Sequence, residues 1–151
     1  MRMGSTEDQR RRTTQEYLAN PIEVNRQIVA EFRSNGGRVP RLGGTSGLLL
    51  LTTRGARSGQ VRTTPMMYAT EGDRYVVYAS DAGARHHPGW YHNLVAHTEV
   101  TVEVGTERFA ATAVITTGED RERLWRLFPF PEHEQKAQRQ IPVIALDRRG
   151  P

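Results

Sequence analysis

Two segments of the chain combine residue types that suit the binding of an anionic ligand. The first segment, residues 52–62, carries Arg54, Arg57 and Arg62 among small residues that include Ser58. A guanidinium group binds phosphate through two parallel N–H groups, and the backbone amides of a glycine-containing turn add further donors. An ordinary solvated hairpin, with glycines for the turn geometry and arginines for solubility, explains the same spacing. This segment alone therefore leaves a phosphate site and a plain hairpin both open.

The second segment, residues 79–94, runs through small residues into the start of a helix. Pro88 suits the first turn of a helix, and helix N-termini attract anions through their free N–H groups. On this helix Trp90 and Asn93 lie three residues apart and share a face, where they are suited to flank a flat heteroaromatic ring. Equally, Trp90 and Leu94 are typical of residues that pack in a hydrophobic core.

Several kinds of catalytic site are excluded by what the sequence lacks. The chain has no cysteine, which rules out disulfides, thiolate nucleophiles, zinc ribbons and iron–sulfur clusters. Its five histidines lack the helical pairing of a zinc site, so we expect surface or capping roles for them and no bound metal. No serine lies in a nucleophile elbow, and the glycines at 43, 44 and 47 precede a strand, whereas a dinucleotide fingerprint follows one.

The elements that must hold these segments follow from the apolar periodicity. Asn20 and Pro21 are typical of a helix start, and Gly36 ends that helix. Pro65 has no N–H, so the strand that contains it is expected at an edge or a bulge. Thr117 with Asp120 predicts a capped helix. Six strands are predicted, at 48–53, 61–70, 74–80, 99–104, 107–116 and 141–146, with a further helix at 88–97. This order favours a mostly β chain with α additions (α+β), in which the strands form an antiparallel barrel.

Length and charge indicate one domain with a basic extension. We expect residues 20–151 to form a single domain and residues 1–19 to be a flexible basic tail; a helical extension that touches a membrane surface is the alternative. The longest apolar run is far shorter than the ~20 residues of a membrane span, and no apolar stretch follows the N-terminal arginines, so a cytoplasmic protein is expected. The net charge of +4 is scattered along the chain, which does not favour nucleic-acid binding.

Taken together, the two segments resemble the deazaflavin (coenzyme F-420)-dependent nitroreductase family, also called quinone reductases. The resemblance is carried by LLLTTRGARSGQVRTTPMMY at residues 49–68, by YASDAGARHHPGWYHNL at 78–94 and by the closing IPVIAL. It implies a split antiparallel β-barrel similar to flavin reductases and pyridoxamine-phosphate oxidases. It also implies hydride transfer from reduced coenzyme F-420 to a menaquinone-like quinone or another electron-poor acceptor. A flavin mononucleotide-binding oxidoreductase on the same barrel and a non-catalytic deazaflavin carrier are the alternatives.

The resemblance also implies roles for individual residues. The phosphodiester tail of the coenzyme would be held by Arg57, Ser58 and Arg62, with Thr64 and Pro65 along its path. The deazaflavin ring would be surrounded by Ala79, Ser80, Trp90 and Asn93. Ser80 would act in catalysis by stabilising the acceptor oxygen that becomes anionic. Asp81 departs from the family pattern, because a basic residue is common there.

The stretch from Phe128 to Gln140 is the predicted acceptor site. Pro129 and Pro131 interrupt it, so a rigid excursion is more consistent with the sequence than a continued helix. As a lid over the ring, this stretch would stack a quinone on its phenylalanines and offer it a hydrogen bond. The alternative is that the phenylalanines plug the core. The residues assigned to the acceptor are Met67, Phe128, Phe130 and His133. Nitro-drug reducers of the family have tyrosines in this stretch, so reduction of nitro compounds is less expected.

Overall fold

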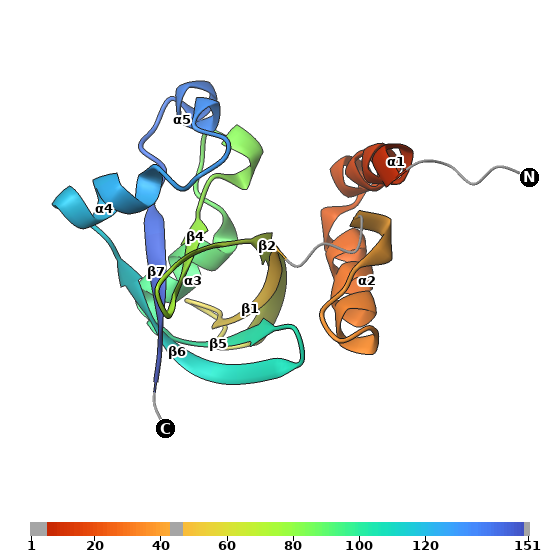
Figure 1. The fold of residues 1–151 in the computed structure, drawn as a ribbon, viewed down its shortest axis with the longest axis horizontal. Helices are drawn as coiled ribbons and strands as arrows, with labels where there is room; N and C mark the ends of the chain where they lie inside the picture. The colour runs from red at the N-terminus through yellow and green to blue at the C-terminus, as the bar shows by residue number, and fades with distance from the viewer. Residues whose placement is uncertain (1–5, 43–46, 150–151) are drawn as a thin grey trace, which may run out of the picture.

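The structure is a computed structural model that describes residues 6–42 and 47–149. Gly43 and Gly44, which the sequence analysis places before the first strand, lie outside the described residues, as does the beginning of the predicted tail. The described part is a single curled antiparallel sheet with helices at its ends and along one side (Figure 1). The predicted split antiparallel barrel with α additions is therefore confirmed.

Seven strands pair in the order β2-β1-β5-β6-β7-β4-β3, and every pairing is antiparallel. The sequence predicts one strand over residues 61–70, but the chain breaks its extended run at Tyr68 and forms two strands there. The strands are β1 Leu48–Arg54, β2 Val61–Met67, β3 Ala69–Glu71, β4 Arg74–Tyr78, β5 Glu99–Val104, β6 Glu107–Ile115 and β7 Val143–Arg148.

The two edges of this sheet are consecutive in the chain. β2 lies at one edge and β3 at the other, and Tyr68 alone separates them. A chain that passes from one edge to the other within one residue forces the sheet to curl, which produces the half-barrel seen in Figure 1. Pro65 lies opposite Leu50 in the pairing of β2 with β1. The expectation that Pro65 lies on an edge strand is confirmed.

β1 is buried on both of its faces, which explains its unbroken apolar run. Leu49 and Leu51 point into the barrel core, which also contains Val77, Val102 and Leu146. Leu50 points the other way, into a second cluster formed with the helix α2. In a strand that is buried on both faces, consecutive residues are apolar, and polar and apolar residues do not alternate.

Helix α2, Pro21–Ser34, confirms the predicted helix and its cap. The Asn20 side chain accepts a hydrogen bond from the N–H of Glu23 at 3.3 Å. The predicted cap at Thr117 is wrong in detail: its side chain makes no capping hydrogen bond, and the helix begins at Gly118, which has a φ of 59°. The remaining helices are α1 Thr6–Ala19, α3 Gly89–Ala96, α4 Gly118–Trp125 and α5 Glu132–Ala137, with short 3-10 turns η1 Pro40–Leu42 and η2 Asp81–Gly83.

The segment predicted as a flexible tail is helical where the structure describes it. Helix α1 leads directly into α2, and Tyr17 near its end packs against the cluster that contains Val24, Ile28 and Phe32. This packing stabilises the helix, although the polar composition of the segment alone does not indicate it. The alternative expectation of a helical extension agrees with the structure; its contact with a membrane stays a prediction.

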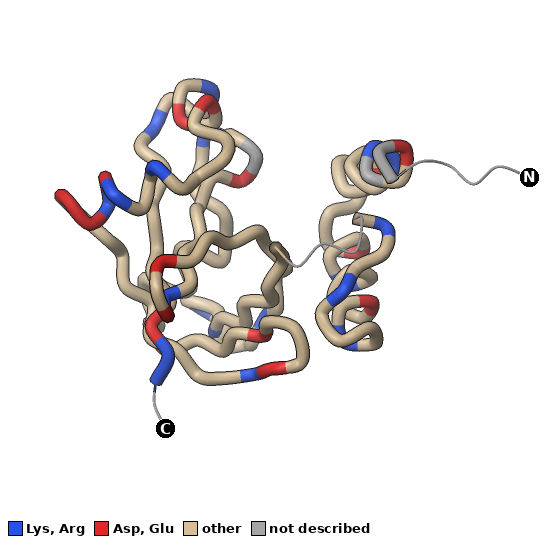
Figure 2. The backbone as a smooth tube through the Cα atoms, in the orientation of Figure 1, with Lys and Arg blue, Asp and Glu red and all other residues tan. Residues whose placement is uncertain are grey.

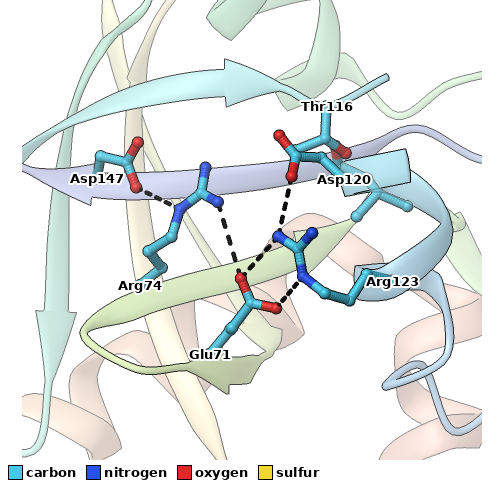
Figure 3. Close-up of polar contacts among 7 residues, drawn as sticks. Glu71, Arg74, Thr116, Asp120, Arg123 and Asp147 are labelled. Carbon is cyan, nitrogen blue, oxygen red and sulfur yellow. Dashed lines mark hydrogen bonds and ion pairs between the residues drawn. The ribbon is translucent and has the colours of Figure 1, made fainter. Parts of the chain in front are cut away.

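An ion-pair network joins the β3–β4 hairpin to β7 and α4 (Figure 3). Arg74 donates to Asp147 at 2.8 Å, and Arg123 donates to Glu71 at 2.5 Å and pairs with Asp120 at 3.0 Å. The hydrogen bonds from Arg123 hold the pKa of the Glu71 carboxyl below its usual value. Elsewhere on the described chain Lys and Arg are interspersed with Asp and Glu along the helices and loops (Figure 2).

Candidate functional site

An apolar cavity of about 450 Å³ opens beside the seam where β2 passes into β3. Thr64 to Ala69 form one wall, and the ends of β4 and of the loop after it form another. The chain between α4 and α5 forms the third wall, with Phe128 stacked on Tyr78 at a ring-centroid distance of 4.5 Å. The lining residues are Tyr17, Asn25, Thr64, Pro65, Met66, Met67, Tyr68, Ala69, Tyr78, Ser80, Asp81, Trp90, Leu127, Phe128, Pro129, Phe130 and His133.

A more polar groove of about 840 Å³ adjoins this cavity. We name it the arginine groove, because the guanidinium groups of Arg57 and Arg62 lie along it. Within the part of the chain that the structure describes, neither guanidinium pairs with a carboxylate. The groove and the apolar cavity share five lining residues, so one elongated ligand can occupy both: Tyr17, Asn25, Thr64, Asp81 and Trp90.

The structure brings almost all of the predicted site residues to these two hollows. The arginine groove is lined by Arg57, Ser58, Arg62 and Asn93, and the apolar cavity by Pro65, Met67, Ser80, Phe128, Phe130 and His133. Thr64 and Trp90 line both. Ala79 is the exception and lines neither hollow: its side chain is 0% exposed and belongs to the barrel core, because side chains just after β4 alternate between core and cavity.

The turn that carries the arginines is fixed to helix α3. The side-chain oxygen of Asn93 accepts a hydrogen bond from the N–H of Ala56 at 3.0 Å, and its amide donates to Thr53 at 3.3 Å. The turn is tight at Gly55, where a Cβ would lie 2.5 Å from the Ser58 hydroxyl and 3.2 Å from the carbonyl oxygen of Gln60, so a side chain there would displace the Ser58 hydroxyl. That hydroxyl accepts a hydrogen bond from the N–H of Gln60 at 3.2 Å. Asn93 and Ser58 therefore shape the turn as well as lining the groove.

An aromatic wall separates the apolar cavity from the barrel. The Tyr78 hydroxyl donates to the carbonyl oxygen of Leu124 at 2.6 Å, and burial raises the pKa of Tyr78 to about 12. Phe128 packs between Tyr78 and Trp125, whereas Phe130 is 38% exposed and stacks on the ring of His133 at 5.2 Å. Phe128 is thus anchored in the wall, and Phe130 lies at the mouth of the cavity.

Two of the residues that line both hollows, Asp81 and Tyr17, differ in how readily the sequence reveals them. Asp81, which the sequence analysis singles out as unusual, has a positive φ of 46° at the start of η2. Tyr17 was missed, because its segment reads as a polar tail. Burial, followed by the nearby charge of Asp81, raises the pKa of the Tyr17 hydroxyl. No local pattern marks Tyr17, because the N-cap Asn20 ends the helical spacing of α1 before the apolar face of α2 begins.

Among residues 6–42 and 47–149, no group of three or more His, Asp or Glu side chains is placed to hold a metal ion. No helix in the described ranges is both long and apolar enough to cross a membrane.

Sequence comparison finds a family that matches most of the chain. The profile of the F420H(2)-dependent quinone reductase family matches residues 24–148. An F420H(2)-dependent quinone reductase of Mycobacterium tuberculosis is 40% identical over 137 residues, which are 85% of this chain and 92% of the relative.

Solved structures agree with this result. An F420-H2 dependent reductase superposes with a TM-score of 0.62 at 36% identity, over 67% of this chain and 94% of its own. A structure described as a domain-swapped dimer gives a TM-score of 0.65 at 31% identity, over 85% of this chain and all of its own. A heme-binding protein of Mycobacterium smegmatis, with a TM-score of 0.53 at 13% identity, shares the fold alone. The match over residues 24–148 and the identity to curated relatives show that this chain belongs to the F420H(2)-dependent quinone reductase family.

Proposed function

We propose that this protein transfers a hydride from reduced coenzyme F-420 to a quinone, with the coenzyme tail in the arginine groove and the acceptor in the apolar cavity. The observation that carries the proposal is the continuity of these two hollows through Thr64, Asp81 and Trp90. One end suits an anion and the other a flat apolar ring, which is the combination a phosphodiester-linked deazaflavin requires. Membership of the family makes the chain an oxidoreductase that depends on this coenzyme.

The residues of the arginine groove fit the coenzyme tail. Arg57 and Arg62 present two guanidinium groups without a carboxylate partner in the described chain, and a phosphodiester supplies the missing charge. Asp81 lies at the junction with the apolar cavity, which neither Arg57 nor Arg62 lines. Its negative charge disfavours a phosphate at this point, so the groove has a direction: the tail lies toward Arg57 and the ring toward Trp90.

The chain's own residues bind, orient and stabilise, because the coenzyme supplies the hydride when it is bound. Trp90 and Pro65 present flat or rigid surfaces on which an aromatic ring can lie. An acceptor oxygen gains negative charge on reduction and then takes a proton. Ser80, which lines the cavity, would donate a hydrogen bond to that oxygen and lower the barrier.

His133 would be a second donor to the acceptor. Its Nδ1 is buried and has no hydrogen-bond partner in the described chain, while the ring stacks on Phe130. A buried N–H without an acceptor is costly, so the neutral ring would keep its proton on Nε2. The Nε2–H would then be the group offered to a quinone oxygen, with Met67, Phe128 and Phe130 against the apolar part of a menaquinone-like ring.

We further propose that the protein is cytoplasmic and touches the inner face of the membrane, where menaquinone-like acceptors reside. Arg11 and Arg12 are exposed on α1, and Leu18 and Ile22 at the α1–α2 junction are each 76% exposed. Basic residues beside exposed aliphatic side chains suit a weak contact with an anionic bilayer surface.

A titration and a turnover assay test the proposal together. Oxidised coenzyme F-420 is expected to bind with a saturable change in its fluorescence, and flavin mononucleotide to compete poorly. The reduced coenzyme should then be oxidised without oxygen when menadione is added, with one hydroquinone formed for each coenzyme consumed. Binding without oxidation would identify a carrier, and tighter binding of flavin mononucleotide would identify a flavin enzyme; either result contradicts the proposal.

A further inference from the structure

A single arginine outside the two hollows holds the loop that carries Ser80. Five hydrogen bonds join the Arg139 guanidinium to residues 79–87. Nη2 of Arg139 donates to three carbonyl oxygens, those of Ala79 at 3.0 Å, Ser80 at 3.2 Å and His86 at 3.0 Å. Nε donates to the carbonyl oxygen of Ala84 at 3.0 Å. Nη1 lies 2.9 Å from Nδ1 of His87. Because an arginine cannot accept, Nδ1 of His87 is the acceptor in the last contact.

Arg139 belongs to the stretch from Phe128 to Gln140, whose residues Phe128, Phe130 and His133 line the apolar cavity and are called the acceptor wall below. It follows α5 after Gln138, which takes the left-handed conformation with a φ of 54° and turns the chain back toward the loop. α5 also packs on η2: a Cβ on Gly83 would lie 2.9 Å from Cδ of Lys136. The acceptor wall and the Ser80 loop therefore meet along α5 and Arg139.

We infer that Arg139 is a positioning residue, which fixes Ser80 and Asp81 against the acceptor wall formed by Phe128, Phe130 and His133. The inference rests on the proposed function, because it concerns the distance between the coenzyme side and the acceptor side of one site. It adds a residue that lines neither hollow and that the sequence analysis did not select.

The geometry explains why an arginine is needed at this position. Four of its acceptors are backbone carbonyl oxygens of a loop that makes few hydrogen bonds of its own. A planar guanidinium has five N–H groups in a fixed fork, whereas a lysine ammonium has three on a flexible stem. A lysine keeps the charge but cannot reach carbonyl groups on both sides of the loop at once.

Arg121 supplies a matched control. It is buried, whereas Arg139 is partly buried, and it holds the other side of the same segment by donating to the Glu134 carboxylate and to the Ile141 carbonyl oxygen, both at 2.8 Å. In the described chain its hydrogen bonds, ion pairs and ring contact go to Trp125, Glu122, Glu134 and Ile141, and none reaches residues 79–87. An Arg121→Lys variant therefore loosens the segment without removing a contact to the Ser80 loop.

The first readout needs neither coenzyme nor acceptor. The N–H groups of Gly83 and Ala84 donate to the carbonyl oxygens of Ser80 and Asp81 within η2, so hydrogen exchange at these amides reports the loop. In Arg139→Lys we expect exchange at Gly83 and Ala84 to be at least tenfold faster than in the wild type. In Arg121→Lys we expect these two rates to stay within twofold of the wild type. His87→Phe, which removes one contact and keeps the ring beside Tyr91, should shift the same amides by a smaller factor.

The second readout separates positioning from folding. In folded Arg139→Lys we expect kcat for quinone reduction to fall on the order of tenfold to a hundredfold, because small misplacements of reacting groups are costly. The KM for the quinone should change less than threefold, and Arg121→Lys should lose less kcat than Arg139→Lys does. The inference is overturned if exchange at Gly83 and Ala84 is unchanged in Arg139→Lys, or if Arg121→Lys loses as much kcat. Should the wild type fail to reduce quinones, the proposed function fails, and the exchange result still decides whether Arg139 holds the loop.

Discussion

Asn93 on helix α3 accepts a hydrogen bond from the N–H of Ala56 at 3.0 Å, across the entrance to the arginine groove. The contact joins the two segments that the sequence analysis selected separately, residues 52–62 and residues 79–94. Arg57, the next residue of the turn, therefore projects from a backbone that this hydrogen bond holds in place. Arginines on a fixed turn lose less conformational freedom on binding than arginines on a free loop, which supports the proposed site for the coenzyme tail.

Removal of the groove arginines is expected to weaken coenzyme binding without unfolding the chain. Each charge-assisted hydrogen bond contributes ~1.5–3 kcal/mol, and ~1.4 kcal/mol is tenfold in affinity. Arg57→Ala should therefore raise the dissociation constant of oxidised coenzyme F-420 by about tenfold or more, and Arg57→Ala with Arg62→Ala by more than either alone, as followed by fluorescence titration. Arg54 is the control, because it lies on the same hairpin but lines a different hollow. Unchanged binding in the folded double variant would reject the tail site.

The two phenylalanines of the acceptor wall are expected to differ. Phe130 lies at the mouth of the cavity, so Phe130→Ala should raise the KM for a menaquinone analogue several-fold and leave coenzyme affinity unchanged. Phe128 packs between Tyr78 and Trp125, so Phe128→Ala should also lower the melting temperature by about 5 °C or more. Steady-state kinetics and thermal unfolding of both variants measure the difference. A Phe130→Ala variant that loses only thermal stability would place Phe130 in the core and the acceptor elsewhere.

Protonation of His87 is expected to destabilise the protein at acidic pH. Burial, followed by the charges of Arg139 and His92, lowers the pKa of His87 below its ordinary value of 6.5. The unfolded chain therefore binds a proton at a higher pH than the folded chain does. The stabilisation is fully present above about pH 6.5 and is lost as the pH falls through the lower pKa of the folded state. Urea unfolding between pH 7.5 and pH 5 should reveal this loss, and His87→Gln should flatten it. His97→Gln, an exposed site, should keep the wild-type slope.

The membrane contact of α1 has its own test. Deletion of residues 1–14 removes Arg11 and Arg12 but keeps Tyr17, which lines the site. Each basic residue near an anionic surface contributes about 1 kcal/mol. We expect the full chain to cosediment with acidic liposomes at low salt and the deleted chain not to, while both bind the coenzyme equally. A full chain that stays in the supernatant would contradict the proposed contact.

The strands and the long helix of the fold could be predicted from local patterns. The leucines of β1, the cap at Asn20 and the proline in β2 each act within a few residues of their own position. The errors have long-range causes. Tyr68 breaks the strand because the sheet closes there, and α1 orders because Tyr17 meets the α2 cluster. Neither contact leaves a periodic trace in the sequence.

In the candidate site, too, residues could be predicted where the residue type itself suggests a role, and not where the role depends on long-range contacts. Arg57, Arg62 and Trp90 were found because their types suit a ligand, whatever surrounds them. Arg139 was not found, since its importance lies in five acceptors that are 52 to 60 positions away along the chain. Ala79 was assigned to the site because the sequence does not show whether a small side chain at the end of a strand faces the cavity or the core. Side chains of successive residues point in opposite directions there, so a shift of one residue decides which of the two it faces.

The seam between β2 and β3 has a consequence for the life of the protein in a cell. Thr64 to Ala69 belong to both edges of the sheet and line the apolar cavity, so a molecule seated there contacts the barrel where it closes. A ligand at a hundred times its dissociation constant adds about 2.7 kcal/mol to the folded state. Chains that open at the seam are the ones that proteases degrade, and a change of this size alters abundance several-fold. The amount of this protein should therefore follow the supply of the molecules that fill the site: cells starved of the deazaflavin and of its acceptor would clear the protein and would not accumulate it in an idle form.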